Sequence, residues 1–403
     1  MGLLSTLTLL TLAAAPLMST QTGYRNGSTM TGLDVLVAEG FKPLLGKRVG
    51  LVTNHTGVDR NGRRSIDSMR AAGVQLVALF SPEHGFAGTE DRSGLGDATD
   101  AATSLKIFSL YGKTLRPTAE MLQGIDALVF DIADVGVRFY TYETTMAFCM
   151  EEAAKAGIAY YVLDRPNPVT GVRVEGPLLG EGNTSFAGYH PGTPARHGMT
   201  MGELAGMFNA ERKIGANLTV IKMKDWQRTD WFDSTGLPWI NPSPNMRSLK
   251  AAILYPGVCL VEFAKNISVG RGTDSPFEQM GADFIKGREL AAELNSRGIP
   301  GIRVYPTSFT PTESRFKDVK VEGVRFEIVD REAVDSVRLG IELACAIEKL
   351  YPGKVDWKES RKLIGSDDVV ARIAAGDDAA TIQKSWGADL ERFRTIRQKY
   401  LLY

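Results

Sequence analysis

Short apolar runs alternate with amphipathic stretches along the first half of the chain, from about residue 47 onward. The apolar runs are almost unbroken, which is typical of strands buried on both faces. The predicted strands cover residues 48–53, 74–80, 105–110, 127–132, 158–163 and 218–223. The predicted helices between them cover residues 63–72, 118–123, 141–156 and 201–212. Repeated strand–helix–strand units predict an α/β fold with a Rossmann-like, mainly parallel sheet and helices on both faces.

The pattern changes near residue 245, after a segment rich in Gly and Pro. Beyond it we expect mixed strands and helices. These include a strand in the apolar run 251–263, a helix that opens at Pro276, a long helix over 331–350 and a final helix ending in QKYLLY. We therefore predict a Rossmann-like subdomain over 30–245 and a smaller α+β subdomain over 246–403.

The first 23 residues, MGLLSTLTLLTLAAAPLMSTQTG, have the composition of a secretory leader. The apolar run from Leu3 to Leu12 is too short to span a bilayer, and no Lys or Arg precedes it. We expect the protein to be exported to the periplasm or the exterior. No stable membrane insertion is expected after the leader is removed.

Charge and motifs exclude several functional classes. Lys+Arg and Asp+Glu each number 47, so the basic excess that nucleic-acid binding requires is missing. Neither G-x-G-x-x-G after the first strand nor a P-loop is present, which argues against a nucleotide cofactor. The four histidines and three cysteines are scattered and show no zinc spacing. We predict no cofactor and no metal, and buried cysteines that form at most one bridge.

Polar residues follow three of the predicted strands. Ligands bind at the carboxyl ends of the strands in parallel sheets, so we expect these side chains to converge on one crevice. They are Glu83 and His84 after the second strand; Asp131, Asp134 and Arg138 after 127–132; and Asp164 and Arg165 after 158–163.

Glu83 is the strongest candidate for chemistry. It lies between Pro82 and His84, close to two phenylalanines, where partial shielding from water favours the protonated form of a carboxyl group. That environment suits a general acid. The alternatives are an exposed loop glutamate or a helix cap. Ser81 raises the possibility of an acyl-transfer hydrolase, but Pro82 makes the turn unlike a nucleophile elbow.

Other candidates are individually weaker. Arg271 lies between two glycines, which bend the backbone closely around a guanidinium that suits a ligand carboxylate; a structural Arg–Asp clamp is the alternative. Glu262 is a further candidate acid. Asp131 and Asp134 could hold Arg138 or accept sugar hydroxyls, or simply cap a helix. The remaining candidates for substrate binding are Asn54, Tyr140, Tyr142, Asn241, Asn245 and Asp274.

A series of motifs resembles one known family. In chain order they read GLDVLVAEGF, RVGLVTNHTG, FSPEHGFAG, VFDIADVGVRFYTY, LDRPNP, NPSPNMRSL, LYPGVCLVE, SVGRGTDSPFEQ and YLLY, and they run from Gly32 to Tyr403. Together they resemble the exo-acting β-N-acetylmuramidases of peptidoglycan turnover, the NamZ-like family. The resemblance implies a Rossmann-like N-terminal and a smaller C-terminal subdomain with the catalytic cleft between them. It also implies Glu83 as the catalytic glutamate of the S-P-E-H-G motif.

The activity implied by this resemblance is release of N-acetylmuramic acid from the non-reducing end of peptidoglycan fragments, such as muropeptides and N-acetylmuramyl disaccharides. We expect hydrolysis through an oxocarbenium-like transition state, with His84 beside Glu83. The second carboxylate is left open among Glu262, Asp131 and Asp134, as is participation of the substrate acetamide. Arg271 or Arg138 would pair with the lactyl carboxylate of the sugar. The rival functions are a non-catalytic muropeptide-binding protein and another wall hydrolase, an amidase or esterase.

Overall fold

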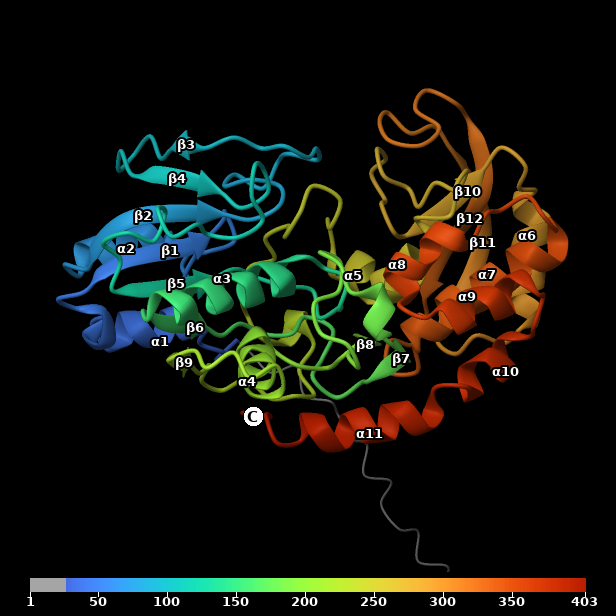
Figure 1. The fold of residues 1–403 in the computed structure, drawn as a ribbon. Helices are drawn as coiled ribbons and strands as arrows, with labels where there is room; N and C mark the ends of the chain where they lie inside the picture. Colours follow the sequence, from blue (N-terminus) through green and yellow to red (C-terminus); the bar gives the residue numbers. More distant parts are fainter. Residues whose placement is uncertain (1–26) are drawn as a thin grey trace, which may run out of the picture.

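The computed structural model describes residues 27–403, and its ribbon forms two units that lie side by side (Figure 1). The predicted leader lies outside the described residues. Within residues 27–403, no helix is both long and apolar enough to cross a membrane.

A seven-stranded sheet forms the centre of the first unit, in the order β3-β4-β2-β1-β5-β6-β9. All neighbouring strands run parallel except the edge pair β3 and β4, which is antiparallel. The strands are β1 (Arg48–Thr53), β2 (Gln75–Ser81), β3 (Ala98–Thr99), β4 (Lys106–Ser109), β5 (Ala127–Asp131), β6 (Ala159–Leu163) and β9 (Leu218–Ile221). The carboxyl ends of the parallel strands therefore share one edge, where ligands of such sheets bind.

Helices cover both faces of this sheet. Helices α1 (Gly32–Ala38) and α2 (Ser65–Ala71) share one apolar cluster with Leu51 and Val129, whereas α3 (Tyr142–Ala156) and α4 (Met201–Glu211) share another with Leu128. Successive residues of β5 thus enter opposite clusters, because side chains alternate across a strand. Burial on both faces explains why these strands are continuous apolar runs. The predicted α/β fold with helices on both faces is confirmed.

The second unit combines a small antiparallel sheet with helices. Its sheet has the order β10-β12-β11, from β10 (Gln279–Ala282), β11 (Ile302–Phe309) and β12 (Val321–Ile328). Its helices are α5 (Leu249–Val258), α6 (Gly287–Ser296), α7 (Ser336–Leu350), α8 (Arg361–Ile364), α9 (Asp367–Ala374), α10 (Ala379–Lys384) and α11 (Gly387–Arg397). A two-stranded ribbon, β7 (Glu175–Leu178) and β8 (Pro194–Arg196), lies between the two units (Figure 1).

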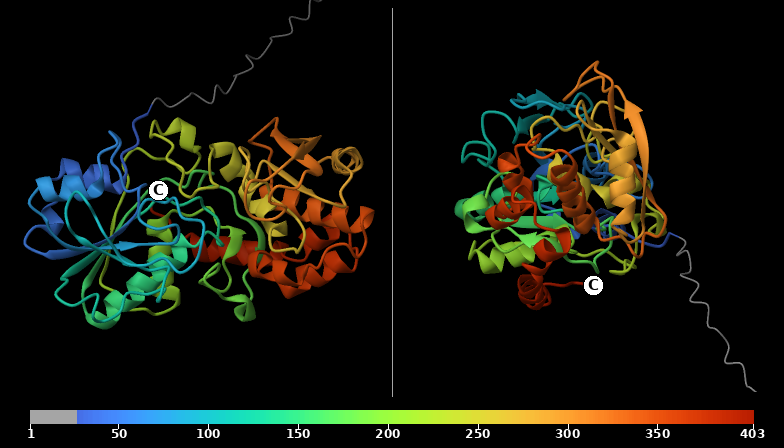
Figure 2. Two further views of the ribbon diagram at one scale, coloured as in Figure 1. Left: turned by 90° about the horizontal axis from the view of Figure 1, so that it is seen from above. Right: turned by 90° about the vertical axis from the view of Figure 1, so that its right-hand side faces the viewer.

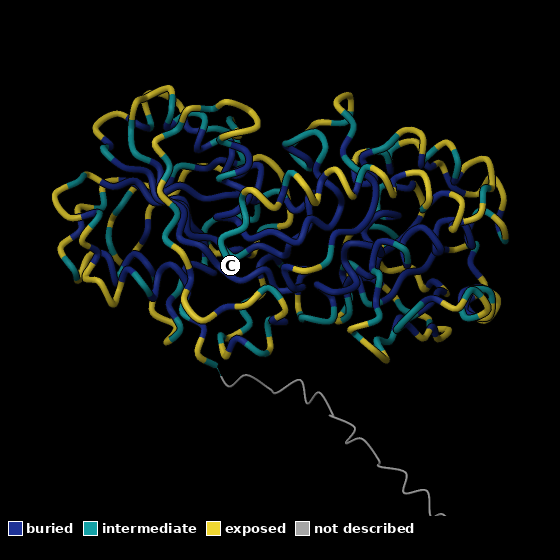
Figure 3. The backbone as a smooth tube through the Cα atoms, turned by 90° about the horizontal axis from the view of Figure 1, so that it is seen from below, coloured by how far each residue is buried: buried dark blue, intermediate teal, exposed yellow. Residues whose placement is uncertain are grey.

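The two units share a continuous core. One cluster of buried side chains includes residues of the central sheet as well as residues of α5, α7 and β12. Figure 2 shows the units end to end along an elongated molecule, and Figure 3 shows buried backbone running through both. The predicted boundary near residue 245 falls just before α5. It stays a prediction.

Five local predictions were wrong. The final helix does not include QKYLLY, because α11 ends at Arg397. Residues 118–123 form only turns, since so short a segment rarely repays helix nucleation. Pro276 opens no helix, because Phe277 has φ +63° and the chain passes directly into β10. Residues 251–261 of the run predicted as a strand are helical, and a segment buried on all sides shows no period that separates strand from helix. The long helix begins at Ser336 rather than 331, where Asp335 accepts a hydrogen bond from the backbone N–H of Arg338.

The C-terminus returns to the first unit. Helix α11 runs beneath the molecule, and the last residues reach α4 and β9 (Figure 1). The Tyr403 hydroxyl donates to Oδ2 of Asp164 (2.7 Å) and accepts from the Met223 backbone N–H (2.8 Å). The YLLY terminus thus fastens the second unit to the sheet of the first.

Candidate active site

A cavity of about 270 Å³ lies where the two units meet. Both units supply its walls, so neither could form it alone. The first unit contributes Glu83, His84, Asp91, Tyr140 and Thr141, and the second contributes Tyr255, Glu262, Phe263, Arg271 and Phe277.

Glu83 lies two residues beyond the end of β2, in the loop that carries it into this cavity. The Thr141 hydroxyl donates a hydrogen bond to Oε2 of Glu83, which leaves Oε1 for a ligand. Tyr111 is a second neighbour, since burial and then contact with Glu83 raise the pKa of its phenol. No cationic side chain among residues 27–403 forms an ion pair with Glu83.

His84 has φ +68°, a left-handed conformation that is uncommon for a residue other than glycine. Its Nδ1 lies 2.7 Å from the Glu90 carbonyl oxygen. Because a carbonyl only accepts, Nδ1 carries the hydrogen, and Nε2 is the nitrogen left for a ligand. Strained conformations of this kind gather at functional sites.

Arg271 links two carboxylates in the cavity wall. Its Nε donates to Oε1 of Glu262, and its Nη1 lies 3.5 Å from Oδ2 of Asp91. Burial alone would lower the pKa of Arg271, but these two carboxylates outweigh burial and raise it. The predicted bend at the flanking glycines is present: Gly272 has φ +75°, and a Cβ there would lie 2.6 Å from the Glu313 nitrogen.

Glu262 differs from Glu83 in its surroundings. Both of its oxygens are occupied, Oε1 by Arg271 and Oε2 by the Cys259 thiol at 3.0 Å. The guanidinium of Arg271 thus places a fixed positive charge beside Glu262. The cavity thus holds two carboxyl groups, of which only Glu262 lies beside a cation. Such a difference in surroundings lets one site provide both an acid and a base or stabilising anion.

Asp91 was not predicted from the sequence. Its Oδ2 accepts from the Asn245 side-chain amide at 2.9 Å, and its Oδ1 lies 3.7 Å from Nδ1 of His84. Asn245 itself was predicted, and the structure brings it to the site through this contact rather than into the cavity lining. Nothing in the local sequence marks Asp91, because it follows a polar loop and not a strand.

Aromatic rings form the remaining wall. Tyr140 packs edge-on against Tyr142 (centroids 4.9 Å apart) and Tyr255 (5.9 Å), and Tyr255 packs against Phe277 (4.7 Å). Tyr140, a predicted substrate-binding residue, lines the cavity. Tyr142 is fully buried behind it and donates to the Pro242 carbonyl. Tyr142 therefore supports the wall without lining it.

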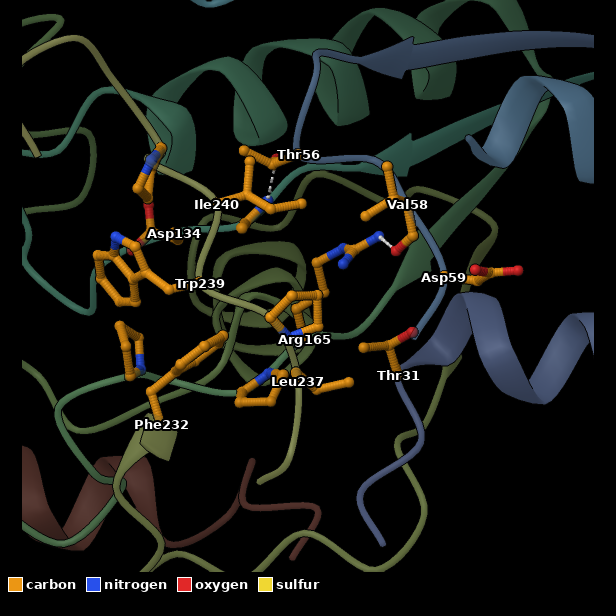
Figure 4. A pocket seen from close by; sticks show the side chains of 15 residues that line it. Thr31, Thr56, Val58, Asp59, Asp134, Arg165, Phe232, Leu237, Trp239 and Ile240 are labelled. Carbon is orange, nitrogen blue, oxygen red and sulfur yellow. Dashed lines mark hydrogen bonds between the residues drawn. The ribbon is translucent and has the colours of Figure 1, made fainter. Parts of the chain in front are cut away.

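A second, smaller cavity lies beside the carboxyl ends of β1, β5 and β6 (Figure 4). Its volume of about 40 Å³ admits little more than water, so it cannot hold a sugar. Asp134 and Arg165 line it, together with Trp239. The strand-end residues predicted to share one crevice are thus separated: Glu83 and His84 line the large cavity, and these two line the small one.

Several predicted site residues are held within the protein. Asp131 is fully buried and accepts from Nε of Arg165 at 2.7 Å. Asp164 accepts from Thr200 and the Gly202 backbone as well as Tyr403, and burial raises its pKa to about 6. The structure brings neither aspartate into the large cavity. Their strand-end position reflects sheet packing.

Arg138 is also fully buried. It donates to the carbonyl oxygens of Leu363 and Ile364 and so ties the first unit to α8. Burial lowers its pKa to about 10. Its guanidinium lies outside the cavity lining and is not placed to bind a sugar carboxylate.

The remaining predicted residues lie away from the large cavity. Asn54 accepts from Thr56 and donates to the Tyr142 hydroxyl at 3.3 Å. The Asn241 carbonyl accepts from His55, and the Asp274 side chain is fully exposed near Arg247. Asn54 helps to position Tyr142. Asn241 and Asp274 make no contact with residues of the cavity wall that would suggest a role in binding.

The family description Exo-beta-N-acetylmuramidase NamZ, N-terminal, matches residues 49–250, and its C-terminal counterpart matches residues 253–403. The peptidoglycan beta-N-acetylmuramidase NamZ of Bacillus subtilis (strain 168) is 42% identical over 407 residues. That alignment covers 100% of this chain and 98% of that protein.

Two solved structures are also similar. Both are DUF1343 family proteins from Bacteroides fragilis NCTC 9343. The first has a TM-score of 0.87 and 37% identity, covering 93% of this chain and 99% of that chain. The second has a TM-score of 0.76 and 31% identity, covering 94% and 99%.

Proposed function

The chain belongs to the exo-β-N-acetylmuramidase NamZ family, and we propose that it is an exo-acting glycoside hydrolase that releases N-acetylmuramic acid from the non-reducing end of peptidoglycan fragments. The relative from Bacillus subtilis supports this assignment over the full length of the chain. The fragments that we propose as substrates are muropeptides and N-acetylmuramyl disaccharides.

One observation carries the proposal beyond family membership. Glu83 and Glu262 come from different units and line the same cavity, and only Glu262 is paired with a cation. Glycoside hydrolysis needs one carboxyl group that donates a proton to the leaving oxygen and commonly a second one that remains charged. We assign the general acid to Glu83 and the charged role to Glu262, with Asp91 as a second anion beside Arg271.

The rival functions lose support from the same geometry. Ser81, the nucleophile that an esterase or amidase would require, is buried at the end of β2 and lies outside the lining of the large cavity. A purely binding protein would not require an uncompensated acid beside a paired one. A measurement of substrate turnover distinguishes an enzyme from a muropeptide-binding protein.

The test is hydrolysis of a chromogenic N-acetylmuramic acid β-glycoside by the wild type and by Glu83→Gln. The N-acetylglucosamine analogue serves as the substrate control, and equal thermal unfolding of both proteins serves as the folding control. We expect turnover of the muramyl compound and a loss of about 10²–10⁴-fold in the variant, less if the leaving group is good. Absence of turnover on this compound and on short glycan fragments would favour the binding-protein alternative.

Export to the periplasm or the exterior is part of the proposal and is supported by the apolar N-terminal run. Cell fractionation of the full-length chain, compared with a chain lacking residues 1–23, tests it. Export requires the full-length chain to leave the cytoplasm while the truncated chain stays inside.

A further inference from the structure

A third cavity of about 190 Å³ adjoins the proposed active site. The two share four lining residues: Glu262, Phe263, Arg271 and Ser314. Small-molecule pockets usually enclose about 300–1,000 Å³, a range that the two cavities reach only when they are taken together. The adjoining cavity is therefore a side chamber with room for a substituent of the sugar.

Arg315 lines this side chamber. Its guanidinium donates to the carbonyl oxygens of Ala264 and Ile267, and within residues 27–403 it forms no ion pair with a carboxylate. Burial lowers the pKa of Arg315, and the attraction of Glu262 offsets this only in part. A half-buried cation without an anionic partner is costly, which makes it a site for an anionic ligand.

Arg271 is in the opposite situation. It already pairs with Glu262 and Asp91, so a ligand carboxylate would have to compete with two fixed anions. The sequence favoured Arg271 as the carboxylate-binding arginine because of its glycine neighbours. The pattern of ion pairs instead points to Arg315.

The backbone around Arg315 is held in an unusual conformation. Its two neighbours, Ser314 and Phe316, have φ +62° and +60°, and neither is glycine. The loop is anchored by Thr312, whose backbone N–H and hydroxyl both donate to the Gly272 carbonyl. Strain of this kind persists where the surroundings impose it, and it is common at ligand clamps.

We propose that Arg315 binds the lactyl carboxylate of the muramyl sugar in this side chamber and thereby sets the preference for muramyl over glucosaminyl substrates. The inference rests on the proposed function. N-acetylglucosamine has a hydroxyl where N-acetylmuramic acid has the lactyl ether, so the two sugars differ in the lactyl group, whose carboxylate is its only charge. The guanidinium forks of arginine match carboxylates in charge and geometry.

The first experiment measures turnover by the wild type, Arg315→Gln and Arg315→Lys on two chromogenic substrates: the muramyl glycoside and its lactyl carboxamide, which lacks the charge. We expect Arg315→Gln to raise KM for the acid roughly ten- to a hundredfold with little change in kcat. KM for the carboxamide should stay within about twofold, and Arg315→Lys should recover part of the loss.

Arg247→Gln is the matched control. Arg247 also donates to two backbone carbonyls, those of Pro244 and Thr273, but it lines neither the active-site cavity nor the side chamber. It should leave the acid-to-carboxamide ratio unchanged. Equal losses on both substrates in Arg315→Gln would show that Arg315 only supports the loop, and the proposal would fail.

The second experiment separates this inference from the proposed activity. Calorimetry measures binding of free N-acetylmuramic acid and of its carboxamide, and so needs no turnover. Weaker binding of the acid alone to Arg315→Gln supports the carboxylate site even if the protein hydrolyses nothing. Unchanged binding of the acid by a folded Arg315→Gln protein overturns the inference even if the wild type is a muramidase.

Discussion

Thr141 donates its hydroxyl hydrogen to Oε2 of Glu83, and this contact joins the start of α3 to the loop after β2. The two residues are 58 positions apart in the chain. A carboxylic acid that transfers a proton must present one oxygen to the leaving group, and a fixed partner on the other oxygen orients it. Thr141 is thus a positioning residue for the proposed acid.

We therefore expect Thr141→Val, which keeps the shape and removes the hydroxyl, to lower kcat about tenfold or more without a comparable rise in KM. Steady-state kinetics on the muramyl glycoside measures this effect. Thr145→Val is the control, because Thr145 lies one turn later and donates only to the Thr141 carbonyl. If both variants lose activity equally, the loss comes from α3 and not from Glu83.

The two carboxylates Glu262 and Asp131 should respond differently to neutralisation. Glu262→Gln removes a charge from the cavity wall, and we expect a fall of about 10²-fold or more in kcat. Asp131→Asn leaves the Arg165 guanidinium buried without its anionic partner, so we expect a loss of about 3–5 kcal/mol in the free energy of unfolding. Kinetics together with urea unfolding distinguishes the two. A stable but inactive Asp131→Asn protein would argue for a direct role of Asp131.

The stability of the protein should depend on Asp134. Burial raises the pKa of this carboxyl to about 7, and its Oδ2 has no partner in the described chain. In an unfolded chain the pKa is about 3.9, so between about pH 4 and 7 only the folded state holds the proton. Unfolding then releases that proton, and the group's contribution to stability falls as the pH rises.

Asp134→Asn should remove this dependence and so stabilise the protein more at pH 7 than at pH 5. As the pH rises from 5 to 7, the free energy of unfolding of the wild type should fall relative to that of the variant by up to about 1.4 kcal/mol for each pH unit. Urea midpoints for the wild type and the variant across this range measure it. Asp126→Asn is the control: Arg48 lowers the pKa of Asp126 to about 2, so the slope in this window should not change. An unaltered slope in Asp134→Asn would mean that Asp134 is ionised in the folded protein.

The C-terminal tyrosine should matter for stability rather than for chemistry. Tyr403→Phe removes the hydroxyl between Asp164 and the Met223 backbone, and we expect a loss of about 1–3 kcal/mol in the free energy of unfolding. Tyr400→Phe is the matched control, because its hydroxyl makes one exposed contact with Glu211. Thermal unfolding of both variants measures the difference. Equal midpoints would show that the contact with Asp164 contributes little.

Local patterns predicted most of the first unit correctly. The strand β5, predicted as 127–132, is Ala127–Asp131, and α3, predicted as 141–156, is Tyr142–Ala156. Both were recognisable because burial on two faces leaves a continuous apolar run and Gly157 ends the helix. The second unit was harder, since the fully buried run that contains α5 shows no period.

The candidate site was likewise predictable from the sequence only in part. The position of Glu83 follows from the sequence, because a polar loop after a buried parallel strand must emerge at the edge of the sheet where ligands bind. The same rule placed Asp131 and Asp164 at that edge, but only the fold showed that Arg165 and Tyr403 occupy them.

The sequence by itself determined the family, the α/β architecture and the glutamate at the strand end, because these depend on local pattern and on motifs that keep their order. Only the tertiary structure decided which charged and polar groups contact one another. Asp91 reaches Arg271 across 180 residues, and Arg315 reaches Ala264 across 51. The first pairing depends on how the two units pack together, and the second on how distant segments fold within the second unit. Neither residue spacing nor composition carries that information.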